Sequence, residues 1–277
     1  MIPKDMEING SQSSQYLTGL LMAVSISAKK ETVIKVKNPV SWPYIEMTVR
    51  MMRQFGHQID YDQHEKFVVS PYINDHKKHI EIVIESDWSS ASFFIVAAAL
   101  SGSISISGLS VNSLQADRAI INVLNSAGIG FKMMPDSLEV HETNTIQSFE
   151  FDATHCPDLF PILAVLASFA QGDSVLKGVN RLHHKESNRA ITIMSELNKL
   201  GADISLDGDF MKIKGNRNFS GGMVQSHQDH RIAMALSVAA LRANAPVYIQ
   251  QAEVVSKSFP DFFKALKSLG ASLNLIN

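Results

Sequence analysis

One supersecondary pattern occurs four times in this chain and constrains its fold more than any other feature of the sequence. Each occurrence runs strand, helix, strand, helix and then two short strands, and the occurrences begin near Glu7, His79, Ser148 and Gly221. The fourth stops one strand short. The sequence therefore predicts an α/β (α+β) fold made of repeated βαβαββ units.

The first helix of units two to four is apolar on nearly every side, as in FFIVAAAL, FPILAVLASFA and IAMALSVAAL. A helix of this kind is buried on all sides, so strands are expected to enclose the helices. The polar segment SPYINDHKKH separates the first unit from the rest and predicts a hinge between about residues 72 and 86. We expect one domain over residues 1–78 and a second, of three units, over residues 79–277.

Charge and cysteine content exclude several classes of protein. The formal net charge of −2 argues against nucleic-acid and membrane-surface partners. The one cysteine, Cys156, cannot form an intrachain disulfide, and the start of the chain lacks the pattern of a signal peptide. The longest apolar stretch, about residues 159–170, is too short to cross a bilayer. We expect a cytoplasmic protein.

The unusual residues of the repeats lie at the junctions between strands and helices. A helix N-terminus offers free N–H groups and the positive end of the helix dipole, and both favour phosphate or carboxylate. Ser11, Ser13 and Ser14 add hydroxyl donors at one such end. They indicate a phosphate site, or they simply cap the helix.

Four cations lie at junctions of the last two units, in a chain that is slightly acidic overall: Lys185, Arg189, Arg231 and Lys257. Lys185 and Arg189 are four residues apart, which predicts one shared helix face. The cluster favours a small substrate with several negative charges. Taken singly, each motif also has a structural interpretation, because Glu186 beside Lys185 resembles a solvated surface pair and Arg231 could be structural.

Two acidic residues at helix starts could have either a structural or a functional role. Asp229 is an obvious N-cap, and Asp158 heads a nearly all-apolar helix, where it could cap that helix or act as a base.

Metal and nucleotide sites are not indicated. The histidines have no convincing ligand spacing, Cys156 has no identifiable catalytic partner, and no glycine-rich nucleotide loop is present. The histidines in question are His155, His183, His184, His227 and His230.

Seven junction motifs occur in an order and spacing that resemble the EPSP synthase family: SSQYLTGLLMA, VSWPYIEMT, SDWSSASFF, PDLFPILAVLA, KESNRA, DHRIAMALS and SKSFPDFF. The resemblance runs from about Ile8 to the C-terminus. It implies the two-domain enolpyruvyl transferase fold, an inside-out α/β barrel with three βαβαββ units in each domain. Only one unit of the first domain is present here, so that the N-terminal domain is expected to be incomplete.

The resemblance also implies an activity. The family transfers the enolpyruvyl group of phosphoenolpyruvate to the 5-hydroxyl of shikimate 3-phosphate and releases phosphate, without a metal or organic cofactor. C3 of phosphoenolpyruvate is protonated, the hydroxyl attacks C2, and the tetrahedral intermediate then expels phosphate. The complete protein is expected to be a monomer.

The resemblance further implies roles for individual residues. Asp158 accepts the proton of the attacking hydroxyl, and Glu186, with Lys257, handles the proton at the methylene carbon. Shikimate 3-phosphate is bound by Ser13, Ser14, Ser41, Tyr44, Asp158 and Lys185. Phosphoenolpyruvate is bound by Gln15, Arg189, Arg231 and Lys257.

Three positions depart from the family pattern. Trp42 stands where Lys or Arg is frequent. Arg181 stands where several relatives have an Asn that touches the shikimate substrate, so that neighbouring Asn180 could substitute. Asn188 replaces a frequent Asp.

Two alternatives remain open. One is the sister enolpyruvyl transferase acting on UDP-N-acetylglucosamine, which shares the fold. The SSQ, KES and SFPDF motifs, and the lack of a cysteine in the sister enzyme's loop position, favour shikimate 3-phosphate instead. The other is an inactive, truncated protein that binds anions or forms one part of a split protein.

Overall fold

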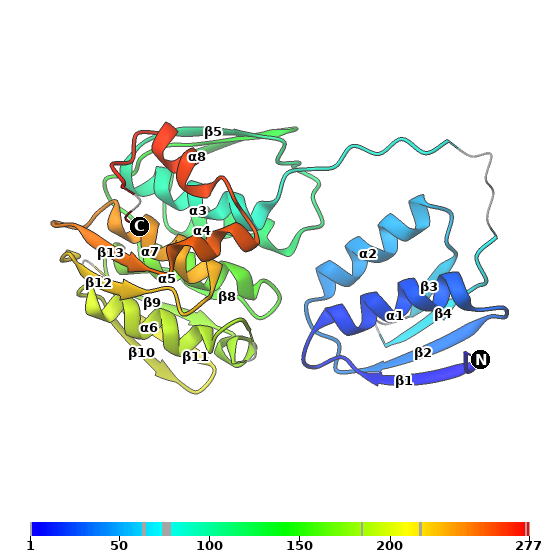
Figure 1. Cartoon of the computed structure of the whole chain (residues 1–277). Helices are drawn as coiled ribbons and strands as arrows, with labels where there is room; N and C mark the ends of the chain where they lie inside the picture. The colour runs from blue at the N-terminus through cyan, green and yellow to red at the C-terminus, as the bar shows by residue number, and fades with distance from the viewer. Residues whose placement is uncertain are drawn as a thin grey trace. The chain divides into compact units, whose positions relative to one another are not determined.

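The computed structural model describes residues 2–62, 65–73, 79–183, 185–215, 218–274 and 276 (Figure 1). The chain divides into two compact units, Met1–Ile84 with Leu114–Ala116, and Glu85–Ser113 with Asp117–Asn277. Residues 74–78, which include the end of the first predicted domain, lie outside the described residues. The domain limits 1–78 and 79–277 stay predictions.

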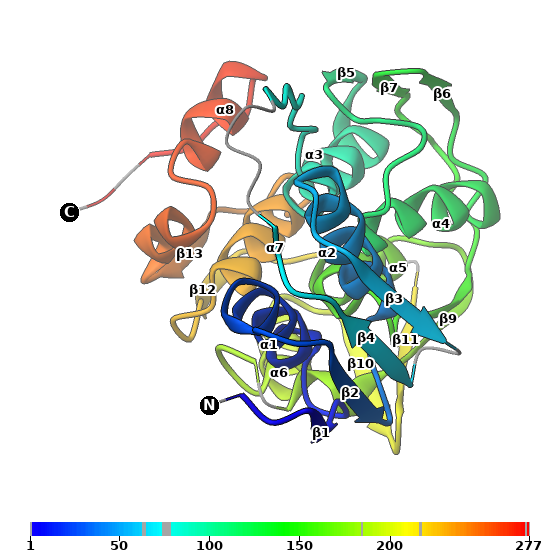
Figure 2. The same cartoon turned by 90° about the vertical axis from the view of Figure 1, so that its right-hand side faces the viewer.

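The smaller unit contains the first repeat. Its elements are β1 (Asp5–Asn9), α1 (Ser14–Ser27), β2 (Thr32–Lys37), α2 (Trp42–Gln54), β3 (Ile59–Asp62) and β4 (Lys66–Val69). The sheet order is β1-β2-β4-β3; β1 runs parallel to β2, and the other pairs are antiparallel. Both helices lie on one side of this sheet (Figure 2). The order βαβαββ predicted for this repeat is confirmed.

The core of the smaller unit follows from the alternation of its strands and the periodicity of its helices. Leu17 and Leu21 of α1 pack with Ile45 of α2 over Ile34 and Phe67 of the sheet. All five side chains are at most 1% exposed. Burial of whole apolar side chains contributes about 1.5–3 kcal/mol each, which holds both helix starts against the sheet.

The larger unit contains the other three repeats, apart from residues 79–84 and 114–116, which belong to the smaller unit. The second repeat comprises α3 (Trp88–Ser101), β5 (Ile104–Ser107), the short helix η1 (Ala116–Ala119), α4 (Ile120–Ser126), β6 (Phe131–Met134) and β7 (Ser137–Val140). The third comprises β8 (Glu150–Asp152), η2 (Pro157–Leu159), α5 (Phe160–Ser168), β9 (Asp173–Lys177), η3 (Val179–Leu182), α6 (Arg189–Lys199), β10 (Asp203–Asp207) and β11 (Phe210–Lys214). The fourth comprises β12 (Gly222–Gln225), α7 (His230–Ala240), β13 (Val247–Gln250), η4 (Ala252–Lys257) and α8 (Phe262–Ser268).

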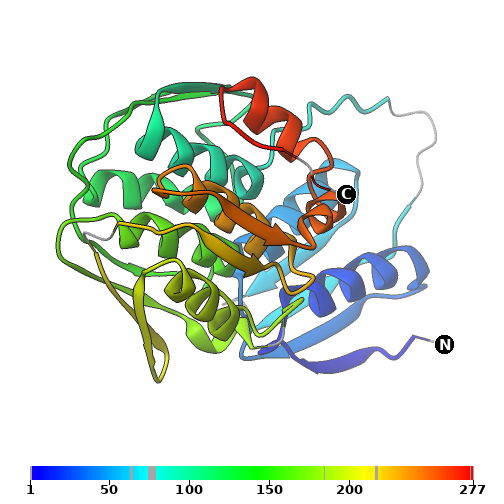
Figure 3. The ribbon, with the colours of Figure 1, turned by 60° about the vertical axis from the view of Figure 1, so that its left-hand side comes forward.

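Three helices form the centre of the larger unit. Every residue of α5 is buried, and α3, α5 and α7 all pack against one another. The sheets β5-β7-β6, β10-β11-β9-β8 and β12-β13 surround them. Figure 3 shows the yellow strands β10 and β11 at the outer edge of this unit. The prediction that the all-apolar helices are buried is confirmed.

Two predicted strands are wrong in the part of the chain that the structure describes. Residues 79–87 contain no strand, and Val83 in this stretch is 92% exposed. Residues 271–274 and 276 also contain no strand, whereas Leu275 lies outside the described residues. In both places the alternating pattern predicts a half-buried strand, but the pattern cannot supply the neighbouring strand that its backbone groups need.

Two predicted helices begin later than expected. Helix α6 starts at Arg189, because Asn188 is its N-cap and its Oδ1 accepts a hydrogen bond from the N–H of Ile191 at 3.5 Å. Lys185 therefore precedes the helix, and the prediction that it shares a helix face with Arg189 is wrong. Helix α8 starts at Phe262 rather than at Phe259. Among the described residues, no helix combines the length and the apolarity that crossing a membrane requires.

Candidate active site

The side chain of Arg189 lies at the centre of an ion cluster in the larger unit. Its guanidinium is 0% exposed. Nε donates to Oδ2 of Asp229 at 2.9 Å, Nη1 donates to Oδ1 of Asp158 at 2.8 Å, and Nη2 donates to Oε2 of Glu186. A second bond joins Nη2 to Oδ1 of Asp229 at 3.3 Å. One buried arginine thus holds three carboxylates by charge-assisted hydrogen bonds.

Helix starts of adjacent repeats bring these residues together. Asp158 lies in η2 just ahead of α5, Arg189 is the first residue of α6, and Asp229 is the N-cap of α7. Helix α6 packs against both α5 and α7, so that the three starts meet. The positive ends of helix dipoles add to the field there. Asp229 does cap its helix, by accepting the N–H of Arg231 at 3.0 Å, and it also binds Arg189.

Further cations surround Asp158. Nη2 of Arg231 lies 3.0 Å from its Oδ2, and Nζ of Lys185 lies 3.7 Å from its Oδ1. Lys185 thus joins the cluster from the turn ahead of α6. The Nζ of Lys257 donates to the backbone carbonyl of Gln228 at 3.1 Å. Among the described residues, the structure pairs Lys257 with no carboxylate.

The cluster keeps its buried carboxylates ionised. Burial alone would raise the pKa of Asp158, but the charges of Arg231, Lys185 and Arg189 outweigh it and hold that pKa well below its usual value. Burial also opposes ionisation of Asp229, and the charge of Arg189 with its hydrogen bonds again lowers the pKa. Both groups are therefore ionised near neutral pH and are not proton donors there.

His230 belongs to the cluster, although its position in the sequence does not predict a role for it. It is the first residue of α7 and is buried, and its Nδ1 lies 3.9 Å from Oε1 of Glu186. Burial lowers its pKa, and the neighbouring charge of Arg231 adds to that effect. The only sequence signal is its place inside the motif DHR.

The predicted residues of the smaller unit lie at its two helix starts. Ser13 is the N-cap of α1, and its Oγ accepts the N–H of Gln15 at 3.2 Å. Ser14 is buried at the first position of α1. The capping interpretation therefore holds for Ser13, whereas the phosphate interpretation for Ser13 and Ser14 stays a prediction.

Ser41 is the N-cap residue of α2 and has an unusual backbone. It is buried and left-handed, with φ 53°, and its side chain makes no capping bond to the helix. Its carbonyl accepts the N–H of Tyr44 at 3.1 Å. Asn38 in the same short loop is also left-handed, with φ 51°. Left-handed non-glycine residues cost of order 1–3 kcal/mol each and gather at ligand sites.

The departures from the family pattern have local explanations in two cases. Trp42 packs its ring edge-on against Tyr61, with 5.2 Å between the centroids, so that it extends the core of the smaller unit. Asn188 caps α6. Asn180 and Arg181 lie in η3, where the N–H of Asn180 donates to Oδ1 of Asp209 at 2.9 Å.

Cys156 and the histidines do not form a second reactive centre in the described part of the chain. Cys156 is buried, and burial raises the pKa of its thiol. No three His, Cys, Asp or Glu residues within the described ranges gather as metal ligands would. His184 lies outside the described residues.

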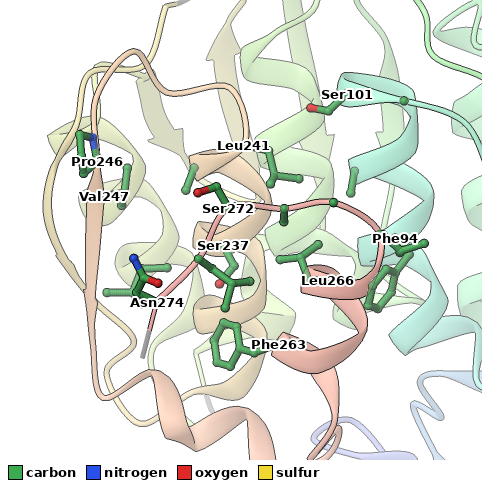
Figure 4. A pocket seen from close by; sticks show the side chains of 18 of the residues that line it. Phe94, Ser101, Ser237, Leu241, Pro246, Val247, Phe263, Leu266, Ser272 and Asn274 are labelled. Carbon is green, nitrogen blue, oxygen red and sulfur yellow. The ribbon is translucent and has the colours of Figure 1, made fainter. Parts of the chain in front are cut away.

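A hollow of about 740 Å³ lies elsewhere in the larger unit, between α3, α7, α8 and residues near the C-terminus (Figure 4). Its lining is largely apolar and includes Phe94, Leu241, Val247, Phe263 and Leu266. No residue of the ion cluster lines it. The largely apolar lining of this hollow contrasts with the charged side chains of the ion cluster.

Comparison with known proteins gives one family. The family model described as EPSP synthase (3-phosphoshikimate 1-carboxyvinyltransferase) matches residues 3–266. The 3-phosphoshikimate 1-carboxyvinyltransferase of Clostridium kluyveri is 36% identical over 270 residues, which are 98% of this chain and 63% of the relative. The protein of that name from Methanocaldococcus jannaschii is 35% identical over 272 residues, 98% of this chain and 62% of the relative.

Solved structures agree with this result. A structure of EPSP synthase from Acinetobacter baumannii superposes with a TM-score of 0.81 at 26% identity and covers 99% of this chain and 64% of that one. The enolpyruvyl transferase NikO from Streptomyces tendae has a TM-score of 0.77 at 17% identity, with 97% and 64% covered, and supports the fold alone. The predicted fold class is confirmed. The chain spans less than two thirds of the length of these proteins.

Proposed function

Because this chain belongs to the EPSP synthase family, we propose that it takes part in transferring the enolpyruvyl group of phosphoenolpyruvate to the 5-hydroxyl of shikimate 3-phosphate. The observation that carries the proposal is the ion cluster around Arg189. It gathers cations and ionised carboxylates at three helix starts, and this is the equipment that an addition and elimination on an anionic substrate requires.

Phosphoenolpyruvate carries a phosphate and a carboxylate, and both suit Arg and Lys side chains. Arg231 and Lys257 are the most direct ligands in this proposal, because each has some solvent exposure. Gln15 is assigned to the same substrate. Arg189 stays a predicted ligand of phosphoenolpyruvate. Its guanidinium already binds three carboxylates, so it must release one of them to bind the substrate. Glu186 is its most exposed partner, at 40%, and would be the first to leave.

Shikimate 3-phosphate is assigned to Ser13, Ser14, Ser41 and Tyr44 for its phosphate end, and to Asp158 and Lys185 at the reacting end. The ionised state of Asp158 fits a group that accepts the proton of the 5-hydroxyl. When a substrate draws Arg231 and Lys185 away from Asp158, its basicity rises, because their charges are what depress its pKa.

The addition and the later removal of a proton at C3 are assigned to Glu186 and Lys257. A proton adds to C3 while the hydroxyl oxygen bonds to C2, and the hydroxyl proton passes to Asp158. Loss of a proton from C3 and departure of phosphate from C2 then restore the double bond. Glu186 fits this role because it is partly exposed and is the carboxylate that Arg189 would release to the substrate. We also propose that the protein acts in the cytoplasm, as a monomer, without metal or organic cofactor.

The test is phosphate release from phosphoenolpyruvate and shikimate 3-phosphate, with the organic product identified by mass spectrometry. The chain is assayed alone and mixed with the N-terminal third of a relative, since it spans less than two thirds of that protein. Product formation in either assay supports the proposal. Product with UDP-N-acetylglucosamine instead, or no binding of either phosphorylated substrate in either assay, overturns it.

A further inference from the structure

The turn between β12 and α7, Ser226–Asp229, has a backbone that needs support. His227 and Gln228 are both left-handed, with φ 54° and 59°, although neither is glycine. Two such residues in succession are costly and persist only where their surroundings fix them. The turn ends at Asp229 and is followed by Arg231, both of the ion cluster. Its backbone conformation therefore determines the positions of their Cα atoms.

A buried carboxylate from another helix fixes this turn. Glu196 of α6 is 1% exposed. Its Oε1 lies 2.8 Å from Nε2 of His227, and its Oε2 accepts the backbone N–H of Gln225 at 3.0 Å. Nζ of Lys199 donates to both oxygens at 2.8 Å. Glu196 therefore binds the turn through the side chain of His227. It also binds β12, the strand just before the turn, through the N–H of Gln225.

The far side of the same turn is bound to a cation of the candidate site. Nζ of Lys257 donates to the carbonyl of Gln228 at 3.1 Å. Oγ of Ser226 donates to the carbonyl of Gln251 at 3.0 Å, which ties the turn to the start of η4. A shift of the turn would therefore move Lys257 as well as Asp229.

A buried carboxylate is an expensive way to join two elements. Well-packed apolar side chains are often equal or better for stability than a buried ion pair. Burial opposes ionisation of Glu196, but hydrogen bonds from Lys199 and His227 outweigh it, and its pKa is lowered. An ionised acceptor with donors on both oxygens specifies the geometry of the turn in a way that an apolar contact would not.

We propose that Glu196, acting through His227, is a positioning residue that fixes the Ser226–Asp229 turn and so places Arg231 and Lys257 for phosphoenolpyruvate. The inference rests on the proposed function of the ion cluster. Glu196 itself binds Ser195, Lys199, His227 and Gln225, and among the described residues it makes no hydrogen bond or ion pair with the ion cluster around Arg189.

The experiment compares three variants. Glu196→Gln keeps the shape but turns one acceptor oxygen into an N–H₂ that faces a donor. His227→Gln removes the imidazole from a partly exposed position and leaves Glu196 with Lys199. Asp207→Asn is the matched control, because it removes one carboxylate from an exposed pair with Lys212 in the same unit. Each is followed by calorimetric phosphoenolpyruvate binding, thermal unfolding and the NMR signal of the Arg189 Nε–H, which donates to Asp229.

Both Glu196→Gln and His227→Gln should weaken phosphoenolpyruvate binding about tenfold or more, as expected for a lost hydrogen bond to a charged group, and shift the Arg189 signal. Asp207→Asn should change neither. Adding Gln228→Gly to Glu196→Gln should restore part of the affinity, because glycine adopts a left-handed backbone without strain. A role limited to overall stability would lower the unfolding temperature without shifting the Arg189 signal.

Three results would overturn the inference: an unchanged Arg189 signal in both variants, unchanged affinity in both, or no recovery with glycine. If neither the unaltered chain nor its mixture with the N-terminal third of a relative binds phosphoenolpyruvate, the proposed function fails. The Arg189 signal still decides the positioning role in that case. If Glu196→Gln does not fold, His227→Gln supplies the same comparison.

Discussion

Replacing Arg189 with Met tests whether the ion cluster also determines the stability of the larger unit. The change keeps an unbranched side chain but removes four hydrogen bonds to three carboxylates. Removing one partner of a buried ion pair typically costs about 3–5 kcal/mol, because the remaining charge is left uncompensated. Asp158 retains Arg231 and Lys185, whereas Asp229 is fully buried and retains only neutral donors. We therefore expect a loss of about 3 kcal/mol at pH 7.

The loss should depend on pH, with a sign that follows from the depressed pKa values of Asp158 and Asp229. Their stabilising contribution is present above the pKa of an unfolded Asp, about 3.9, and is lost as the pH falls through the folded values. The variant lacks the charge that depresses the pKa of Asp229. The difference in unfolding free energy between the two proteins is therefore greatest near neutral pH and shrinks below about pH 4.

Tryptophan fluorescence during urea unfolding measures this difference. The chain has 2 tryptophans. Trp88 is fully buried in the larger unit, so a Trp42→Phe background leaves a reporter for that unit alone. Lys212→Met serves as the control, since its partner Asp207 is exposed and such pairs are worth about 0–1 kcal/mol. A loss under about 1 kcal/mol at pH 7, or an equal loss at pH 7 and pH 3.5, would refute the reasoning.

Other predictions concern single groups. Asp158→Asn should lower kcat far more than it raises KM, measured by phosphate release in the assay that shows activity; equal changes in both would contradict a proton-accepting role. Arg231→Ala and Lys257→Ala should each weaken phosphoenolpyruvate binding by about 1.5–3 kcal/mol in calorimetry, and unchanged binding in both would contradict their assignment. Ser13→Ala should lower the free energy of unfolding by about 1 kcal/mol, measured with urea, because α1 loses its cap. An unchanged free energy of unfolding would mean that solvent replaces the capping bond. Cys156, buried with a raised pKa, should react with a thiol reagent only after denaturant is added; rapid reaction of the folded chain would contradict its burial.

The sequence predicted local structure best where periodicity and burial agree. The strand at residues 32–37 was predicted within its observed limits, because its alternating side chains face a core on one side. Residues 79–86 alternate equally well and form no strand, since a strand also needs a neighbour that no local pattern encodes. The uninterrupted polar and apolar pattern predicts that Lys185 lies in a helix, but Asn188 is the N-cap and the helix begins only at Arg189.

The site could be predicted as a set of residues but not as a network. The cations and Asp158 stood out because they lie at helix starts in a slightly acidic chain. The central position of Arg189, with three carboxylate partners, depends on how α5, α6 and α7 pack and has no signature in one sequence. Asp229 was correctly expected to cap α7, but its contact with Arg189 was missed. The substrate roles of all these residues, and the two domain limits, stay predictions.

The three carboxylates that Arg189 binds come from three separate junctions, and this limits how the repeats can diverge. A change at Asp158, Glu186 or Asp229 leaves the guanidinium with an unused donor in a buried place, and a change of Arg189 to Lys removes the planar fork that reaches all three. Repeats that could otherwise drift independently are therefore tied to one another at these positions. Among descendants of a common ancestor, substitutions at the three junctions should be accepted together or not at all.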